Sequence, residues 1–123
     1  MGEDTARANA RNTRRFPRYP LDVRMVVNIF REGNVSSLWG RSTELGQDGI
    51  GGTLTGELEP GEVVSMEFSL PLSTYPLKLR AVVRYRQGLH YGFEFLTLTE
   101  EQRNSVKRVC QMLAASGGLN SPS

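Results

Sequence analysis

Short runs in which apolar residues stand at every second position constrain the fold of this chain most strongly. A period of two places alternate side chains on opposite faces of a strand. The runs begin near residue 21 and end near residue 97, and turns rich in glycine or proline separate them. The residues expected on the inner faces are Leu21, Val23, Met25, Val27, Ile29, Val64, Met66, Phe68, Leu70, Leu77, Leu79, Ala81, Val83, Tyr85, Tyr91, Phe93 and Phe95. With weaker strands expected at 37–43 and 53–55, the pattern predicts five or six strands.

The period changes only near the end of the chain. Thr99 and Gln102 have the spacing of a capping box, in which each side chain bonds the other residue's backbone N–H. The apolar positions that follow have helical spacing, so a helix is expected over 100–115, ended by the glycines at 117 and 118. Strands followed by one helix predict an all-β fold: a small antiparallel six-stranded β-barrel with one C-terminal α-helix. Closing the barrel removes exposed sheet edges.

An arginine-rich segment directly precedes the first predicted strand. It reads Arg14-Arg15-Phe16-Pro17-Arg18-Tyr19-Pro20. Proline at 17 would break a helix, so the segment is expected to be an extended arm or turn rather than a helical face. Guanidinium groups suit phosphate oxygens and the O6/N7 edge of guanine. The arm therefore predicts an anionic partner that could contain guanine.

The charge distribution places the basic character in this arm. Residues 1–24 hold six arginines against three acidic residues, a net charge of +3, whereas the whole chain has a net charge of +2. The remaining residues hold nine basic and ten acidic groups, a net of −1. This asymmetry favours a local anion site over a broad nucleic-acid-binding face.

Composition limits the remaining possibilities. A length of 123 residues suits one domain, which we expect over 14–115 between a flexible tail at 1–13 and a disordered tail at 116–123. No apolar run reaches the length of a membrane span, and the single Cys110 excludes a disulfide framework. No nucleophile–base pair, metal-ligand cluster or phosphate-binding loop is evident. The sequence thus favours a cytoplasmic protein that is not an enzyme and has no metal or cofactor.

The order of arm, strand, glycine-rich segment, barrel and helix resembles the PilZ domain, a bacterial receptor module for cyclic di-GMP. That family carries RxxxR before its first strand and [D/N]xSxxG a few tens of residues later. Four arginine pairs here have the first spacing, and position selects Arg14 and Arg18. The second motif falls on Glu44-Leu45-Gly46-Gln47-Asp48-Gly49, where only Gly49 matches. The resemblance covers roughly residues 14–115.

The resemblance implies a ligand site. Arg14 and Arg18 would hold the phosphates and guanine edges of cyclic di-GMP, and Arg15 would add a phosphate contact or stack on a base. Glu44 stands where the family has Asp or Asn and would accept from the guanine Watson–Crick donors. Gly49 would allow close approach of the ligand to the backbone. Gly46 replaces the family serine and lacks its hydroxyl.

Three functions are compatible with these residues. The first is a cyclic di-GMP receptor or adaptor that orders its N-terminal arm on ligand binding and signals through contacts with an unidentified effector protein. The second is a degenerate PilZ-like adaptor that does not bind the nucleotide, as the substitutions Glu44 and Gly46 suggest. The third, a small nucleic-acid-binding barrel, has only the basic arm and the arginines at 80, 84 and 86 in its favour, so a nucleic acid polymer is not the expected partner.

Overall fold

Six antiparallel strands close into a barrel. The structure is a computed structural model that describes residues 16–120, with side chains described through residue 116. The barrel strands are β2 (Arg24–Arg31), β3 (Asn34–Gly46), β4 (Gly49–Leu54), β5 (Val63–Phe68), β6 (Leu77–Gln87) and β7 (His90–Thr97). Their order is β3-β2-β5-β6-β7-β4, and pairing of β4 with β3 closes the ring. The predicted six-stranded antiparallel barrel is confirmed.

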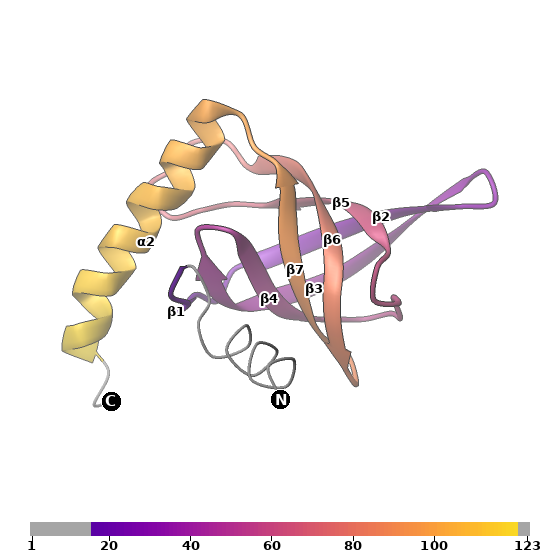
Figure 1. The fold of residues 1–123 in the computed structure, drawn as a ribbon, viewed down its shortest axis with the longest axis horizontal. Helices are drawn as coiled ribbons and strands as arrows, with labels where there is room; N and C mark the ends of the chain where they lie inside the picture. Colours follow the sequence, from indigo (N-terminus) through magenta and orange to yellow (C-terminus); the bar gives the residue numbers. More distant parts are fainter. Residues whose placement is uncertain (1–15, 121–123) are drawn as a thin grey trace, which may run out of the picture.

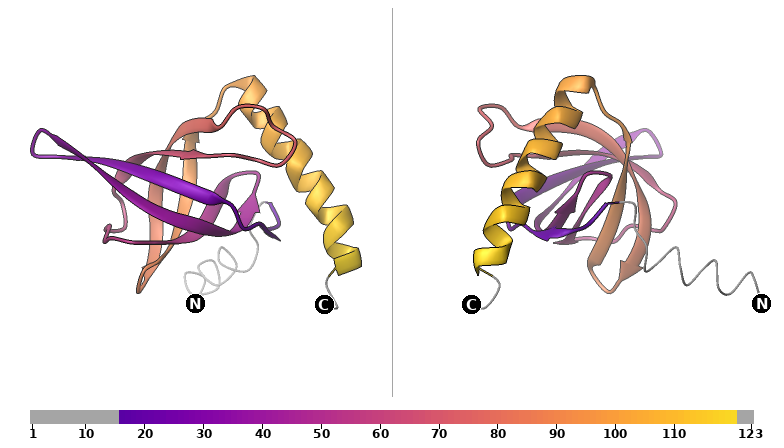
Figure 2. Two further views of the ribbon diagram at one scale, coloured as in Figure 1. Left: turned by 180° about the vertical axis from the view of Figure 1, so that it is seen from behind. Right: turned by 60° about the vertical axis from the view of Figure 1, so that its left-hand side comes forward.

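Two elements flank the barrel at one end. The two-residue strand β1 (Tyr19–Pro20) adds to β3, and α2 (Glu100–Asn120) runs diagonally past that end (Figure 1). At the opposite end the hairpin of β2 and β3 projects beyond the other strands (Figure 2). The arm before the first barrel strand and the helix after the last one are therefore on the same side of the molecule.

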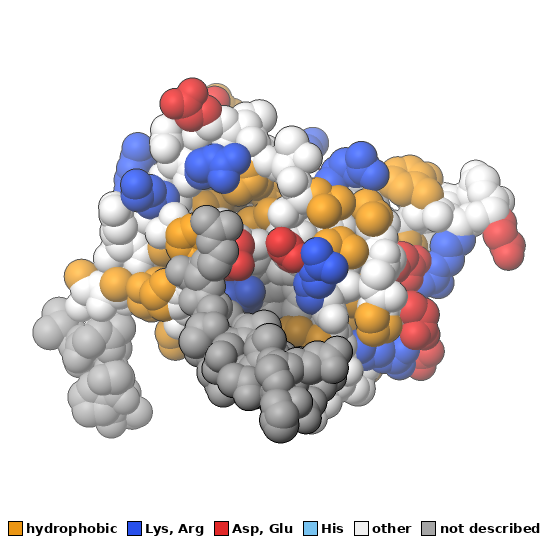
Figure 3. All heavy atoms as spheres, viewed as in Figure 1, with side chains coloured by type: hydrophobic (Ala, Val, Ile, Leu, Met, Phe, Trp, Pro, Cys, Tyr) orange, Lys and Arg blue, Asp and Glu red, His pale blue; other side chains and the backbone are white. Residues whose placement is uncertain are grey.

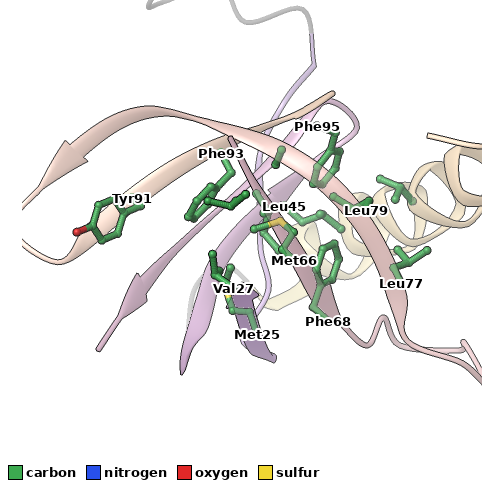
Figure 4. Packing of buried hydrophobic residues seen from close by; sticks show 14 of the residues in the cluster. Met25, Val27, Leu45, Met66, Phe68, Leu77, Leu79, Tyr91, Phe93 and Phe95 are labelled. Atoms are coloured by element: carbon green, nitrogen blue, oxygen red, sulfur yellow. The ribbon is translucent and has the colours of Figure 1, made fainter. Parts of the chain in front are cut away.

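The inner faces of the strands form one apolar core (Figure 4). Met25, Val27, Met66 and Phe68 contribute from β2 and β5, at the positions that the period-two pattern predicts. Phe93 packs 6.1 Å from the ring of Tyr91, and both are fully buried, as expected for the core. Tyr85 is an exception. A register shift between Val83 and Tyr85 in the pairing of β6 with β7 moves its ring out of the core-facing row, so the prediction that it faces inward is wrong.

The glycine-rich segment is a tight hairpin. β3 continues to Gly46 and β4 begins at Gly49, so only Gln47 and Asp48 lie between the two strands. The positive-φ glycines lie elsewhere, at Gly33, Gly61 and Gly88. Close backbone approach, rather than left-handed conformation, therefore accounts for the glycines of this hairpin.

The capping box is confirmed at the start of α2. The Gln102 N–H donates to Thr99 Oγ1 and the Thr99 N–H donates to Gln102 Oε1, each at 3.0 Å. The helix ends later than predicted, because it continues through the two glycines to Asn120 instead of stopping at residue 115. Glycine lowers helix stability by only about 1 kcal/mol relative to alanine, so it weakens a helix without necessarily ending it.

We predict that Tyr91→Phe lowers the free energy of unfolding by about 1–2 kcal/mol, because it removes a partner from buried backbone groups. Tyr91 Oη accepts from the Leu58 N–H at 2.9 Å and donates to the Gly56 carbonyl at 3.2 Å. Urea unfolding would measure the loss. Tyr75→Phe is the control, since the side chain of Tyr75 is exposed, and a loss equal to that of Tyr91→Phe would contradict the assignment.

Candidate functional site

Arg18 is placed by the pairing of β1 with β3. Tyr19 lies opposite Leu45 and Pro20 lies opposite Glu44. The same register brings Arg18 to Gly46, where a Cβ atom built on the glycine would lie 2.7 Å from Arg18 Cδ. The arm therefore runs across the end of the β3–β4 hairpin, with its arginine against a residue that has no side chain.

The guanidinium of Arg18 lies between two carboxylates. Its Nη1 is 3.6 Å from Glu44 Oε2 and its Nη2 is 3.6 Å from Asp48 Oδ1. The Arg18 side chain is 14% exposed, against 28% for Glu44 and 33% for Asp48. Within the described residues, Arg18 Nε and Nη1 and Asp48 Oδ1 are buried without a hydrogen-bond partner. Burying a charged donor without an acceptor is costly, so this group is suited to an additional ligand.

The backbone of the hairpin is fixed by β7. The Phe95 N–H donates to the Asp48 carbonyl at 2.9 Å. A Cβ atom on Gly49 would lie 2.2 Å from the Phe93 carbonyl oxygen and 3.3 Å from Arg18 Nη2. Gly49 is therefore required by the contact between β4 and β7, a structural role that the motif alone does not indicate.

A row of four residues crosses the outer surface beside Arg18. Glu44 pairs with Gly51, Gly51 with Gly92, and Gly92 with Tyr85. A Cβ atom on Gly51 would lie 3.2 Å from Glu44 Cγ, and one on Gly92 would lie 2.0 Å from Tyr85 Cε2. The backbone positions of Glu44 and Tyr85 are about three strand spacings apart along the row. Their side chains lie over the two neighbouring glycines between them, Glu44 over Gly51 and Tyr85 over Gly92.

Sequence reasoning missed Gly51, Gly92 and Tyr85 as parts of this surface. The signal that could have found them was a glycine at an outward position of two strands predicted to be paired. His90 extends the surface, with its ring 5.9 Å from that of Tyr85 and its Nε2 3.1 Å from Thr43 Oγ1. In the view of Figure 3, acidic and basic side chains lie close together near the centre of the molecule.

Helix α2 closes the inner side of the site. Cys110 is buried in the core, and burial raises the pKa of its thiol. The charge of Arg18 acts to lower that pKa and the charge of Asp48 acts to raise it. The helix thus carries the thiol within electrostatic reach of the Arg18–Asp48 pair.

The structure brings together three of the predicted site residues, Arg18, Glu44 and Gly49. Arg14 and Arg15 lie outside the described residues. Trp39 is on a different part of the surface, with the Arg24 guanidinium 4.2 Å from its ring centre. Among the described residues, no group of His, Cys, Asp and Glu could hold a metal ion, and no helix combines the length and hydropathy needed to cross a membrane.

Solved structures share this fold. The PilZ domain of YcgR from Escherichia coli, determined with c-di-GMP, aligns with a TM-score of 0.66 at 17% identity over 90% of this chain and 98% of that chain. The PilZ domain of CeSA from a cellulose-synthesizing bacterium aligns with a TM-score of 0.59 at 19% identity, covering 78% of this chain and 97% of that one. Bacillus subtilis MotI/DgrA aligns with a TM-score of 0.63 at 15% identity over 81% of this chain, which spans 50% of its length.

The sequence comparisons agree with the fold. A search of curated proteins gives no match. The family model for the PilZ domain matches residues 12–111, which include the arm, the whole barrel and most of α2. The matched region contains Arg18, the hairpin of Glu44 and Gly49, and Cys110. The chain therefore belongs to the PilZ domain family.

Proposed function

We propose that this protein is a cyclic di-GMP receptor or adaptor. The observation that carries the proposal is the Arg18 guanidinium, which lies beside the carboxylate of Glu44 and has two buried donors without an acceptor among the described residues. Phosphate and guanine O6/N7 atoms supply acceptors for such donors, and a carboxylate accepts from guanine N1–H and N2–H. Membership of the PilZ family and the c-di-GMP complex of the YcgR domain support the same ligand.

The residues have separate roles in this proposal. Arg14 and Arg18 hold the phosphates and guanine edges, and Arg15 adds a phosphate contact or stacks on a base. Glu44 recognises the Watson–Crick edge. Gly49 keeps the hairpin close to β7 and leaves room beside Arg18. These are binding roles, and the proposal assigns the chain no catalytic reaction.

Ligand binding would also order the arm that carries the arginines. The last part of this arm is already held, because β1 pairs with β3. The proposed change therefore concerns the arginines at 14 and 15, which lie outside the described residues. An arm fastened over the ligand would present a new surface to an effector protein in the cytoplasm, since ligand and arm contacts exist in only one of the two states.

We predict that Tyr85→Ala weakens cyclic di-GMP binding about 5- to 100-fold, because its ring lies over Gly92, in the row that begins at Glu44, and offers a base a stacking surface. Stacking of a base on an aromatic side chain contributes about 1–3 kcal/mol. Tyr85→Phe, which keeps the ring, should bind within about threefold of the natural protein. Calorimetric titration would compare the variants. Equal losses in both would show that the hydroxyl, rather than the ring, matters.

The experiment that tests the proposed function is calorimetric titration of the natural protein with cyclic di-GMP, with GTP as the competing guanine nucleotide. We expect a dissociation constant in the micromolar range or somewhat weaker, near −8 kcal/mol. GTP has neither the second guanine nor the two phosphodiester linkages of cyclic di-GMP, so it should bind far more weakly. Saturable binding of neither nucleotide would overturn the receptor proposal.

The second candidate is a PilZ-like protein–protein adaptor that does not bind cyclic di-GMP. One observation favours it: two carboxylates of the protein itself, Glu44 and Asp48, already neutralise Arg18. The nucleic-acid candidate has less support, since Arg84 is paired with Glu94 at 2.5 Å and Arg86 lies 3.2 Å from Glu59. The titration separates the first two candidates directly.

A further inference from the structure

Asp48 has no place among the ligand contacts proposed above, yet it is one of the two acidic partners of the key arginine. Its carboxylate is 3.6 Å from Arg18 Nη2, two-thirds buried, and its Oδ1 has no hydrogen-bond partner among the described residues. The hydrogen bond from Phe95 N–H to the Asp48 carbonyl fixes the backbone at this point. The charge is therefore held next to Arg18 by the barrel itself.

Gly46 makes this arrangement possible. A Cβ atom there would lie 2.7 Å from Arg18 Cδ, 2.8 Å from Arg18 Nε and 3.1 Å from the Pro17 carbonyl oxygen. Any residue other than glycine would force the Arg18 side chain away from its present position. The absence of a side chain at 46 and the carboxylate at 48 thus act on the same guanidinium.

We propose that Asp48 is an internal competitor that sets the anion affinity of this site, and that Gly46 admits Arg18 to the closed position in which Asp48 holds it. The inference rests on the proposed function and adds to it a residue that determines affinity. A phosphate that binds Arg18 must replace the Asp48 contact or share the cation with it.

Electrostatics determines the direction of the effect. One guanidinium lies between two carboxylates, so the three side chains together carry a net charge of −1. A phosphodiester brought to Arg18 adds a further negative charge close to Asp48, and two like charges in a partly buried site repel each other. Glu44 differs from Asp48 because its carboxylate has a use in the complex, as the acceptor for guanine donors.

The test compares Asp48→Asn with the natural protein by titration with cyclic di-GMP. The amide keeps the size of the side chain and removes its charge, so the affinity should rise about 3- to 30-fold. Asp22→Asn is the matched control. It removes the same charge from an exposed carboxylate paired with Arg41 outside the site, and should change the affinity by less than about twofold.

A second pair of variants separates the position of Arg18 from the charge of Asp48. Gly46→Ala displaces Arg18 without adding a polar group, whereas Gly46→Ser displaces it and also supplies the hydroxyl that the family motif contains. Both should bind at least as tightly as the natural protein, and serine should exceed alanine by about 2- to 10-fold, as expected for one additional hydrogen bond.

A measurement without ligand tests the closed position itself. The ¹⁵N signal of the Arg18 Nε–Hε group, assigned by its loss in Arg18→Lys, should show restricted motion in the natural protein. Asp48→Asn and Gly46→Ala should each increase that motion, and Asp22→Asn should not. Equal mobility in all four proteins would overturn the closed position, whatever the titrations give.

The outcomes distinguish this inference from the receptor proposal. Tighter binding by Asp48→Asn supports it, including the case in which only that variant binds measurably. Natural protein that binds while Asp48→Asn binds equally or more weakly overturns the inference and leaves the receptor intact, because Asp48 would then position Arg18 for the ligand. Absence of binding by every variant overturns both.

Discussion

Arg18→Ala is expected to weaken cyclic di-GMP binding about 10- to 100-fold while leaving the fold intact. Loss of a charge-assisted hydrogen bond typically costs about 1.5–3 kcal/mol. Arg18 provides two buried donors that have no acceptor within the described residues, so the ligand stands to gain these bonds directly. The core contains no part of this side chain, and circular dichroism and thermal unfolding should confirm that the variant is folded.

Matched variants define what the Arg18 result means. Arg14→Ala should give a loss of similar size, because it holds the other position of the RxxxR pair. Arg7→Ala and Arg41→Ala remove the same charge outside the proposed site and should have little effect; Arg41 is exposed and paired with Asp22 at 2.6 Å. Equal losses at all four positions would indicate diffuse charge attraction and favour a nucleic-acid partner.

The barrel was predictable because its strands follow the period-two pattern closely. Met25, Val27 and Ile29 are all buried on β2, and Tyr91, Phe93 and Phe95 are all buried on β7. Each run has one face against a common core, so burial and sequence period coincide. The start of the helix was equally predictable, because the Thr99–Gln102 capping box depends only on residues close together in the sequence.

The details that were not predictable depend on contacts between distant strands. In the sequence, the glycines at 49, 51 and 92 are typical of a loop or a weak strand. In the structure, an atom of a neighbouring strand or of a covering side chain lies where the Cβ of any other residue would be close to it. Tyr85 continues the alternation in sequence, and only the register shift against β7 turns it outward. Such a shift is defined by the pairing of two strands, so the alternation along β6 alone does not locate it.

The candidate site was partly predictable for the same reason. Arg18, Glu44 and Gly49 were identified from motif positions, and the structure brings them together through the β1–β3 register and the β3–β4 hairpin. The motif could not show that Arg18 would turn toward Asp48, because that contact depends on the space above Gly46. Gly46 therefore does more than lack a hydroxyl, because it also leaves the space that the Arg18 side chain occupies.

Gly49→Ala is expected to destabilise the fold by about 3 kcal/mol or more, at the upper end of the usual effect of adding a methyl group to a packed site. The new Cβ would lie 2.2 Å from the Phe93 carbonyl oxygen. That oxygen belongs to the backbone of β7 and cannot move aside as a flexible side chain can, so β4 would have to separate from β7, its neighbour in the barrel. Urea unfolding with an unchanged m-value would measure the loss.

Gly51→Ala, two residues further along the same strand, should lower ligand affinity while leaving the stability of the fold almost unchanged. Its Cβ would press on the Glu44 side chain, 3.2 Å from Cγ and 3.3 Å from Oε2, and a side chain can yield by a few tenths of an ångström. The Tyr91 carbonyl oxygen, 3.5 Å away, would be at an ordinary van der Waals distance. We expect a change in unfolding free energy below about 1 kcal/mol, because no backbone contact is violated. Cyclic di-GMP affinity should nevertheless fall, since the Glu44 carboxylate moves away from its place beside Arg18.

If Gly49→Ala proved as stable as the natural protein and lost only ligand affinity, the glycine of the motif would serve the ligand rather than the barrel, and the structural role given to it here would be wrong.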